Sequence, residues 1–269
     1  MRFTNFLPIC VLFTLSMTSM GHVYANEKKC AQNAFDVVGN NLKIDRFKRQ
    51  DDGGRVVAES CRFWPTENDK DIQVTAFAFM PDAENQVGEA QKMIVISMIN
   101  VMDKRVLYSY LWTIIEDAID QIGPDSLQLA ETPYQLSNKL AAVGLTIHSD
   151  GHFPDCGENA WGDKFSLFVP DGNTFKPVFN VDLIRQRTIH GCISTMSKNS
   201  VWESAELTMS VEKTSANGVY DLMLFAKITT DLAEPPDVPA APRSEKYLIH
   251  FNGDFFAPEI NAPWWVGDM

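Results

Sequence analysis

Three histidines in the second half of this 269-residue chain are the residues whose side chains are best suited to chemistry. They are His148, His152 and His190, and two cysteines and several carboxylates lie near them in the sequence. Zinc prefers imidazole, carboxylate and thiolate ligands, and imidazole and carboxylate also act as general acids and bases. The cluster therefore raises two hypotheses. One is a metal site formed by the three histidines, and the other is the active site of a secreted, metal-dependent hydrolase near His148, His152, Asp155 and His190.

The local sequence argues against a helical zinc motif at these histidines. His148 and His152 have the i, i+4 spacing that places two ligands on one face of a helix, but Gly151 and Pro154 disfavour a helix there. Ser149 also occupies the position where a zinc-protease motif carries its catalytic Glu. We therefore favour a histidine-bearing loop held by a disulfide, with the metal site as the alternative.

Two adjacent tryptophans near the C-terminal end, Trp264 and Trp265, are candidates for an interaction site. Aromatic side chains supply large contact areas at protein interfaces and flat faces for ring-shaped ligands. Packing against the protein's own core is the alternative interpretation. The pair therefore predicts either a partner-binding surface or a docked tail.

An acidic group, Glu116, Asp117 and Asp120, resembles a set of coupled carboxylates that perform acid and base catalysis. Nothing beside it supplies a nucleophile or another catalytic group at a recognisable spacing. We interpret it as the solvated end of a strand or helix.

Motifs that would name a reaction are missing from the sequence. It has no G-x-S-x-G nucleophile elbow, no phosphate-binding loop, no dinucleotide fingerprint and no C-x-x-C redox pair. The sequence predicts no cofactor and favours a protein that is not an enzyme.

Residues 1–25 have the pattern of a cleavable signal peptide. Arg2 is their only charged residue apart from His22, an apolar run over 6–17 follows, and Val23-Tyr24-Ala25 fits the small-x-small cleavage site. The apolar run is shorter than a membrane span needs, and no later segment reaches that length. We expect an exported, soluble chain of residues 26–269, bacterial and either periplasmic or secreted.

Four cysteines follow the predicted leader: Cys30, Cys61, Cys156 and Cys192. An even number of cysteines in an oxidising compartment predicts disulfides, and four cysteines allow three pairings. The pairing that closes the shortest loops joins Cys30 to Cys61 and Cys156 to Cys192. We favour this scheme because each pair flanks its own block of predicted strands.

The net charge of the chain limits the classes of partner that it is expected to bind. The net charge of −12 becomes −13 after the leader is removed, because the leader carries one counted basic residue and no acidic one. Nucleic acids and anionic lipids need a positive surface, so neither is expected as a partner. A protein or a small ligand remains the expected partner.

Alternating and β-branched segments predict strands along most of the chain. Residues 72–80 place apolar side chains on both faces, and 205–228 form a hairpin around Asn217-Gly218, a pair that favours turns. Residues 26–50 fit either one short helix or an irregular arm, and 108–119 fit a strand better than a helix. The predicted strands are 55–64, 72–80, 93–101, 106–115, 126–129, 142–148, 165–169, 175–181, 205–211, 222–228 and 246–251.

These patterns predict a mainly β fold of about nine to eleven largely antiparallel strands, in a sandwich or two twisted packed sheets, with at most one or two short helices. We expect a single β-rich domain over residues 26–269, with a possible subdivision near 150–160. The predicted function is a non-catalytic exported protein with a binding or accessory role in the cell envelope. The hydrolase described above is the alternative.

Overall fold

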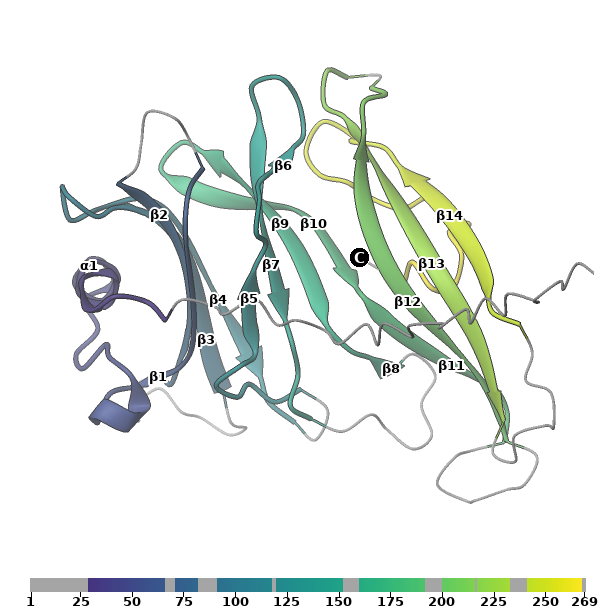
Figure 1. The fold of residues 1–269 in the computed structure, drawn as a ribbon, viewed down its shortest axis with the longest axis horizontal. Helices are drawn as coiled ribbons and strands as arrows, with labels where there is room; N and C mark the ends of the chain where they lie inside the picture. The colour runs from purple at the N-terminus through teal and green to yellow at the C-terminus, as the bar shows by residue number, and fades with distance from the viewer. Residues whose placement is uncertain are drawn as a thin grey trace, which may run out of the picture.

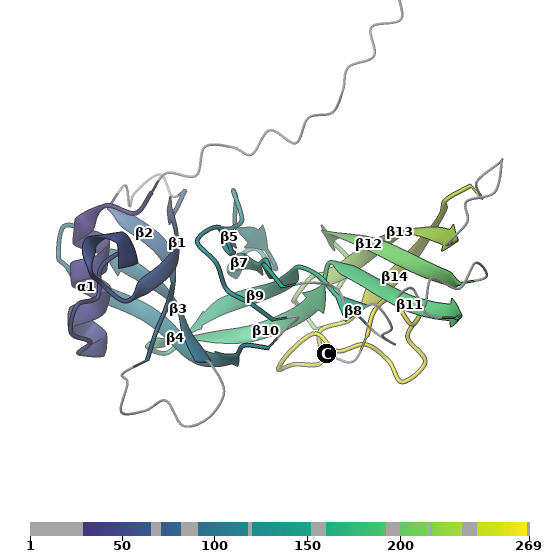
Figure 2. The ribbon, with the colours of Figure 1, turned by 90° about the horizontal axis from the view of Figure 1, so that it is seen from below.

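The computed structural model describes residues 29–65, 71–81, 91–117, 120–151, 160–191, 200–215, 217–232 and 241–267. Figures 1 and 2 show a large curved sheet with the helix against one side and a second sheet on the other. The predicted signal peptide lies outside the described residues. None of the helices in the described ranges has the length and apolar character needed to cross a membrane.

The first elements are the helix α1 (Gln32–Leu42) and the 3-10 turn η1 (Gln50–Asp52). The strands are β1 (Val56–Phe63), β2 (Ile72–Phe79), β3 (Gln91–Asn100), β4 (Arg105–Ile115), β5 (Leu127–Leu129), β6 (Tyr134–Gln135), β7 (Ala141–Ile147), β8 (Ala160–Trp161), β9 (Lys164–Asp171), β10 (Thr174–Asp182), β11 (Ile184–His190), β12 (Val201–Glu212), β13 (Asp221–Leu232) and β14 (Arg243–Ile249).

The larger sheet curls into a nearly closed barrel. Its strands follow the order β1-β2-β3-β4-β10-β9-β7-β5, and the two-residue β6 pairs with β7. At the seam between β1 and β5, the Leu129 N–H donates to the Ser60 hydroxyl at 3.1 Å, and Arg62 Nε donates to the Leu129 carbonyl at 2.9 Å. Side chains of β1 therefore bridge the two edges of the sheet.

Alternation along the strands separates the inside of the barrel from its outside. Ile72, Val74, Ala76 and Ala78 of β2 belong to the core inside the barrel. Phe77 and Phe79 point to the other face, where α1 covers them, and the Phe35 and Phe77 ring centroids lie 4.8 Å apart. The prediction that both faces of this strand are buried is confirmed. Of the two alternatives for residues 26–50, a short helix or an irregular arm, the structure shows a short helix.

The second sheet has the order β14-β13-β12-β11, with the two-residue β8 added beside β11. One of its faces packs against the outside of β9 and β10 in a core that also contains Phe256 and Trp265 of the C-terminal segment. The predicted hairpin of 205–228 is present as β12 and β13, although their pairing ends at Glu212 and Asp221, so the connection is longer than a two-residue turn.

The mainly β fold with one short helix is confirmed, but two finer features differ from the prediction. The larger sheet curls into a nearly closed barrel instead of forming one layer of a sandwich. The described residues form more strands than the nine to eleven predicted, because β6, β8 and β11 were not foreseen. The strands are largely antiparallel as predicted, and the described residues include one parallel contact in the barrel, between Thr174 of β10 and Ser109 of β4. The single-domain prediction stays a prediction.

Candidate functional site

The structure describes two of the three histidines that were predicted as metal ligands. His148 follows β7, is more than half exposed, and contacts the Asp163 carboxylate through Nδ1. His190 ends β11 and is exposed. His152 lies outside the described residues, as do Asp155, Cys156 and Cys192. Within the described ranges no group of three or more His, Cys, Asp or Glu side chains is arranged to hold a metal. The metal and hydrolase hypotheses therefore stay predictions.

The acidic group after β4, which contains Glu116, Asp117 and Asp120, interacts with neighbouring side chains and backbone groups. Glu116 forms an ion pair with Lys92 at 2.5 Å, and its other oxygen accepts the Ile122 N–H at 2.8 Å. Burial raises the pKa of Asp120, while Lys164 opposes this rise and the negative charges of Asp117 and Asp182 add to it. These contacts give Glu116 a structural role in holding the loop to β3.

The two tryptophans have different surroundings. Trp265 is fully buried, and its indole Nε1 donates to a Glu245 carboxylate oxygen at 2.7 Å. Trp264 is half-buried, and the Arg187 guanidinium lies 4.5 Å from the centroid of its ring. Both side chains contact the second sheet. An interaction role for this pair stays a prediction, and Trp265 has no exposed surface to offer a partner.

The same face of the second sheet carries a charged network that sequence reasoning missed. Both oxygens of the buried Glu203 carboxylate are bonded, one to Arg243 at 2.5 Å and the other to Arg187 at 2.6 Å. Hydrogen bonds from Arg243 and then from Arg187 lower the pKa of Glu203, although burial opposes them. The three residues lie on β11, β12 and β14 of one sheet, with β13 between the last two, so only the sheet register brings them together.

We predict that replacing Glu203 with Gln lowers the free energy of unfolding at pH 7 by about 1–2 kcal/mol, because hydrogen bonds to a charged group are lost while both arginines can still reach water. The pKa of Glu203 is lower in the folded state, so its ionised form stabilises the fold above the unfolded pKa. This contribution disappears as the pH falls through the folded pKa.

Urea unfolding between pH 3 and pH 7 measures this dependence. The difference between the wild type and Glu203→Gln should shrink as the pH falls below about 4.5. Glu206→Gln is the matched control, because Glu206 is exposed and its oxygen is 3.8 Å from Lys227. A Glu203→Gln effect that does not change with pH would contradict the prediction.

The disulfide between Cys30 and Cys61 confirms the first predicted pair. It ties the segment before α1 to β1, and both cysteines are buried. The second predicted pair lies outside the described residues. Because Lys29 precedes Cys30 directly, the disulfide also fixes this lysine at the surface of β1.

Arg49 is held in a single position beside this disulfide. Its Nε and Nη2 atoms donate to the same oxygen, Oε1 of Glu59, at 2.9 and 2.8 Å. Nη2 also donates to the Cys30 carbonyl at 2.7 Å, and the guanidinium lies 4.8 Å from the centre of the Phe35 ring. The other carboxylate oxygen of Glu59, Oε2, is buried and has no hydrogen-bond partner among the described residues.

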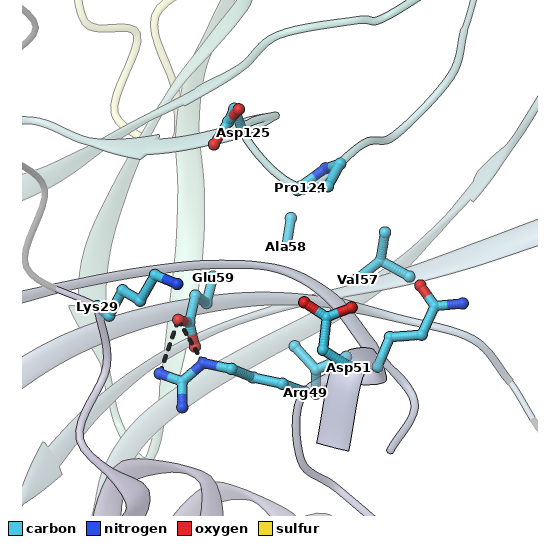
Figure 3. Close-up of a pocket in the computed structure, with 10 residues that line it drawn as sticks. Lys29, Arg49, Asp51, Val57, Ala58, Glu59, Pro124 and Asp125 are labelled. Atoms are coloured by element: carbon cyan, nitrogen blue, oxygen red, sulfur yellow. Dashed lines mark hydrogen bonds and ion pairs between the residues drawn. The ribbon is translucent and has the colours of Figure 1, made fainter. Parts of the chain in front are cut away.

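These groups line an open hollow of about 250 Å³, which we call the acidic hollow. Figure 3 shows Pro124 and Asp125 on one side of it, with Asp51 and the Arg49–Glu59 pair on the other. The lining has three carboxylates, Asp51, Glu59 and Asp125, and two cations, Lys29 and Arg49. Arg49 is already paired with Glu59.

The acidic hollow was not predicted, because its residues come from segments far apart in the sequence and share no motif. The only local signal was Cys30, whose disulfide places Lys29 here. The hollow can accept hydrogen bonds and attract positive charge, but it holds none of the histidines singled out above. Comparisons of the chain with protein-family models, curated proteins and solved structures find no match.

Proposed function

We propose that this chain is an exported, non-catalytic binding protein, and that the acidic hollow binds a ligand through a cationic amine group. The free, buried Oε2 atom of Glu59 is the observation that carries the proposal. A buried carboxylate oxygen without a partner is costly, and a donor from a ligand would remove that cost.

Charge supports the same assignment. Asp51 and Asp125 are exposed carboxylates that line the hollow opposite one another, and Arg49 neutralises only Glu59. The chain as a whole is also strongly acidic, which favours the approach of a cation over that of an anion. An ammonium group would meet acceptors on both sides of the hollow.

The Cys30–Cys61 disulfide supports the export part of the proposal, since such bonds persist mainly in oxidising compartments. It also suits a binding role, because it fixes Lys29 and the backbone that holds Arg49 before any ligand arrives. A preorganised site loses less entropy on binding.

Isothermal titration of the mature chain with spermidine and with tri-lysine tests the proposal. We expect binding of both probes that weakens when salt is raised, and at least a tenfold loss of affinity in the double variant Asp51→Asn, Asp125→Asn. Asp171→Asn, at an exposed turn between β9 and β10, is the matched control and should bind as the wild type does.

Two results would overturn the proposal. One is that neither cation gives a measurable heat of binding at concentrations up to about ten millimolar, which corresponds to a binding free energy weaker than about −3 kcal/mol. The other is equal binding by the wild type and the double variant, because binding would then lie elsewhere on this acidic protein.

A further inference from the structure

A second hollow, of about 460 Å³, lies beyond Lys29 at the other end of β1. Its volume falls in the range of ligand sites, roughly 300–1,000 Å³. We call it the Phe63 hollow, and its lining includes Lys29, Asn33, Arg62, Phe63, Gln73 and Glu131. It shares only Lys29 with the acidic hollow, so its assignment does not depend on the function proposed above.

Gln73 is the residue that marks this hollow as a site. The residue is 7% exposed, and its amide oxygen is buried without a hydrogen-bond partner in the described part of the chain. A buried amide that has lost its water and gained no partner destabilises the fold, so its retention calls for an explanation. A ligand in the hollow would provide the missing hydrogen bond.

Phe63 lies directly beside this amide. It is the cross-strand partner of Gln73 in the antiparallel pair of β1 and β2, so the two side chains share one face of the sheet. Phe63 is nevertheless 59% exposed, although large aromatic side chains are usually covered. A flat apolar surface therefore adjoins an unsatisfied hydrogen-bonding group.

The remaining polar groups of the hollow both donate and accept hydrogen bonds. Asn33 of α1 and the guanidinium of Arg62 are planar groups that can bond two neighbouring atoms at once, and Glu131 adds an acceptor. Arg62 is held by its Nε bond to the Leu129 carbonyl. Adjacent hydroxyl groups, each a donor and an acceptor, match this set.

We propose that the Phe63 hollow binds a neutral saccharide of one or two rings, with the apolar face of one ring on Phe63 and a hydroxyl or acetamido group bonded to the Gln73 amide. An added peptide strand fits less well, because Ser60 and Arg62 already connect this part of the β1 edge to β5. A strand would have to break those bonds to pair with β1.

The test uses the full mature chain and an array of neutral oligosaccharides built from hexoses and N-acetylhexosamines, with saturation-transfer NMR on the ligands that bind. We expect at least one disaccharide to bind, with saturation on its ring C–H protons. Phe63→Ala should weaken this binding at least tenfold. Phe255→Ala is the matched control, because Phe255 is also an exposed phenylalanine, 44% exposed, in the C-terminal segment.

Gln73→Leu gives a second readout that a purely structural residue would not show. Because the buried amide oxygen has no hydrogen-bond partner in the described part of the chain, a similar-sized apolar side chain should leave the melting temperature unchanged or raise it, while saccharide binding is lost. Absence of binding across the array, binding unaffected by Phe63→Ala and Gln73→Leu, or binding of tri-alanine in place of saccharides would each overturn the proposal.

Discussion

Removing the Cys30–Cys61 disulfide is expected to lower the free energy of unfolding by about 3–4 kcal/mol. The two cysteines are 31 residues apart, so the bond restricts a sizeable loop of the unfolded chain. Both are also buried in the core under α1, so the double variant Cys30→Ala, Cys61→Ala loses some packing as well. Urea unfolding of this variant and of the wild type, without reductant, measures the difference.

The same variant separates stability from site geometry. The disulfide holds the Cys30 carbonyl that accepts a hydrogen bond from Arg49 in the acidic hollow, so we expect weaker spermidine binding even at temperatures where the variant is fully folded. Lys29→Met, with the disulfide intact, is the control for the lysine charge alone. A double variant as stable as the wild type within about 1 kcal/mol would show that this bond adds little constraint to the unfolded chain.

The local elements were largely predictable because they depend on alternation and turn chemistry. The hairpin of β9 and β10 turns at Gly172, whose φ of 59° suits glycine, and its strands cover the predicted segments 165–169 and 175–181. Residues 108–115 form a strand as favoured. In each case the deciding information lies within about ten residues of sequence.

The closure of the barrel was not predictable, because it depends on two edges far apart in the chain. Ser60 and Arg62 meet Leu129 across 67 or more residues, and each is an ordinary polar residue in its own segment. β11 was missed for a related reason. Its inward-facing residues include Arg185 and Arg187, which are compensated by partners on other strands, so the segment shows no apolar alternation.

The candidate site escaped prediction for the same physical reason. Histidines are few, and their chemistry can be inferred from the residue type alone. A glutamine such as Gln73 suggests a site only when its burial and its missing hydrogen-bond partner are known. The sequence supplied one real clue, the pairing of Cys30 with Cys61, since loop closure favours cysteines that are near in sequence.

The C-terminal segment is the element that joins the second sheet to the barrel, and Trp265 is its anchor. This side chain is fully buried, packs edge-on against Tyr247 with ring centroids 6.4 Å apart, and bonds to Glu245. The Phe256 N–H of the same segment donates to the Val178 carbonyl of β10 at 2.7 Å. The segment therefore contacts both sheets.

We predict that Trp265→Ala lowers the free energy of unfolding by about 3–5 kcal/mol, because a large buried side chain leaves a cavity and Glu245 loses its indole donor. Trp265→Phe should cost less, since most of the volume remains. Trp264→Ala is the matched control. Its ring is half-buried against Arg187, so a loss of about 1 kcal/mol is expected. Denaturant unfolding of the three variants gives these values, and equal losses for Trp264→Ala and Trp265→Ala would show that Trp265 does not anchor the segment.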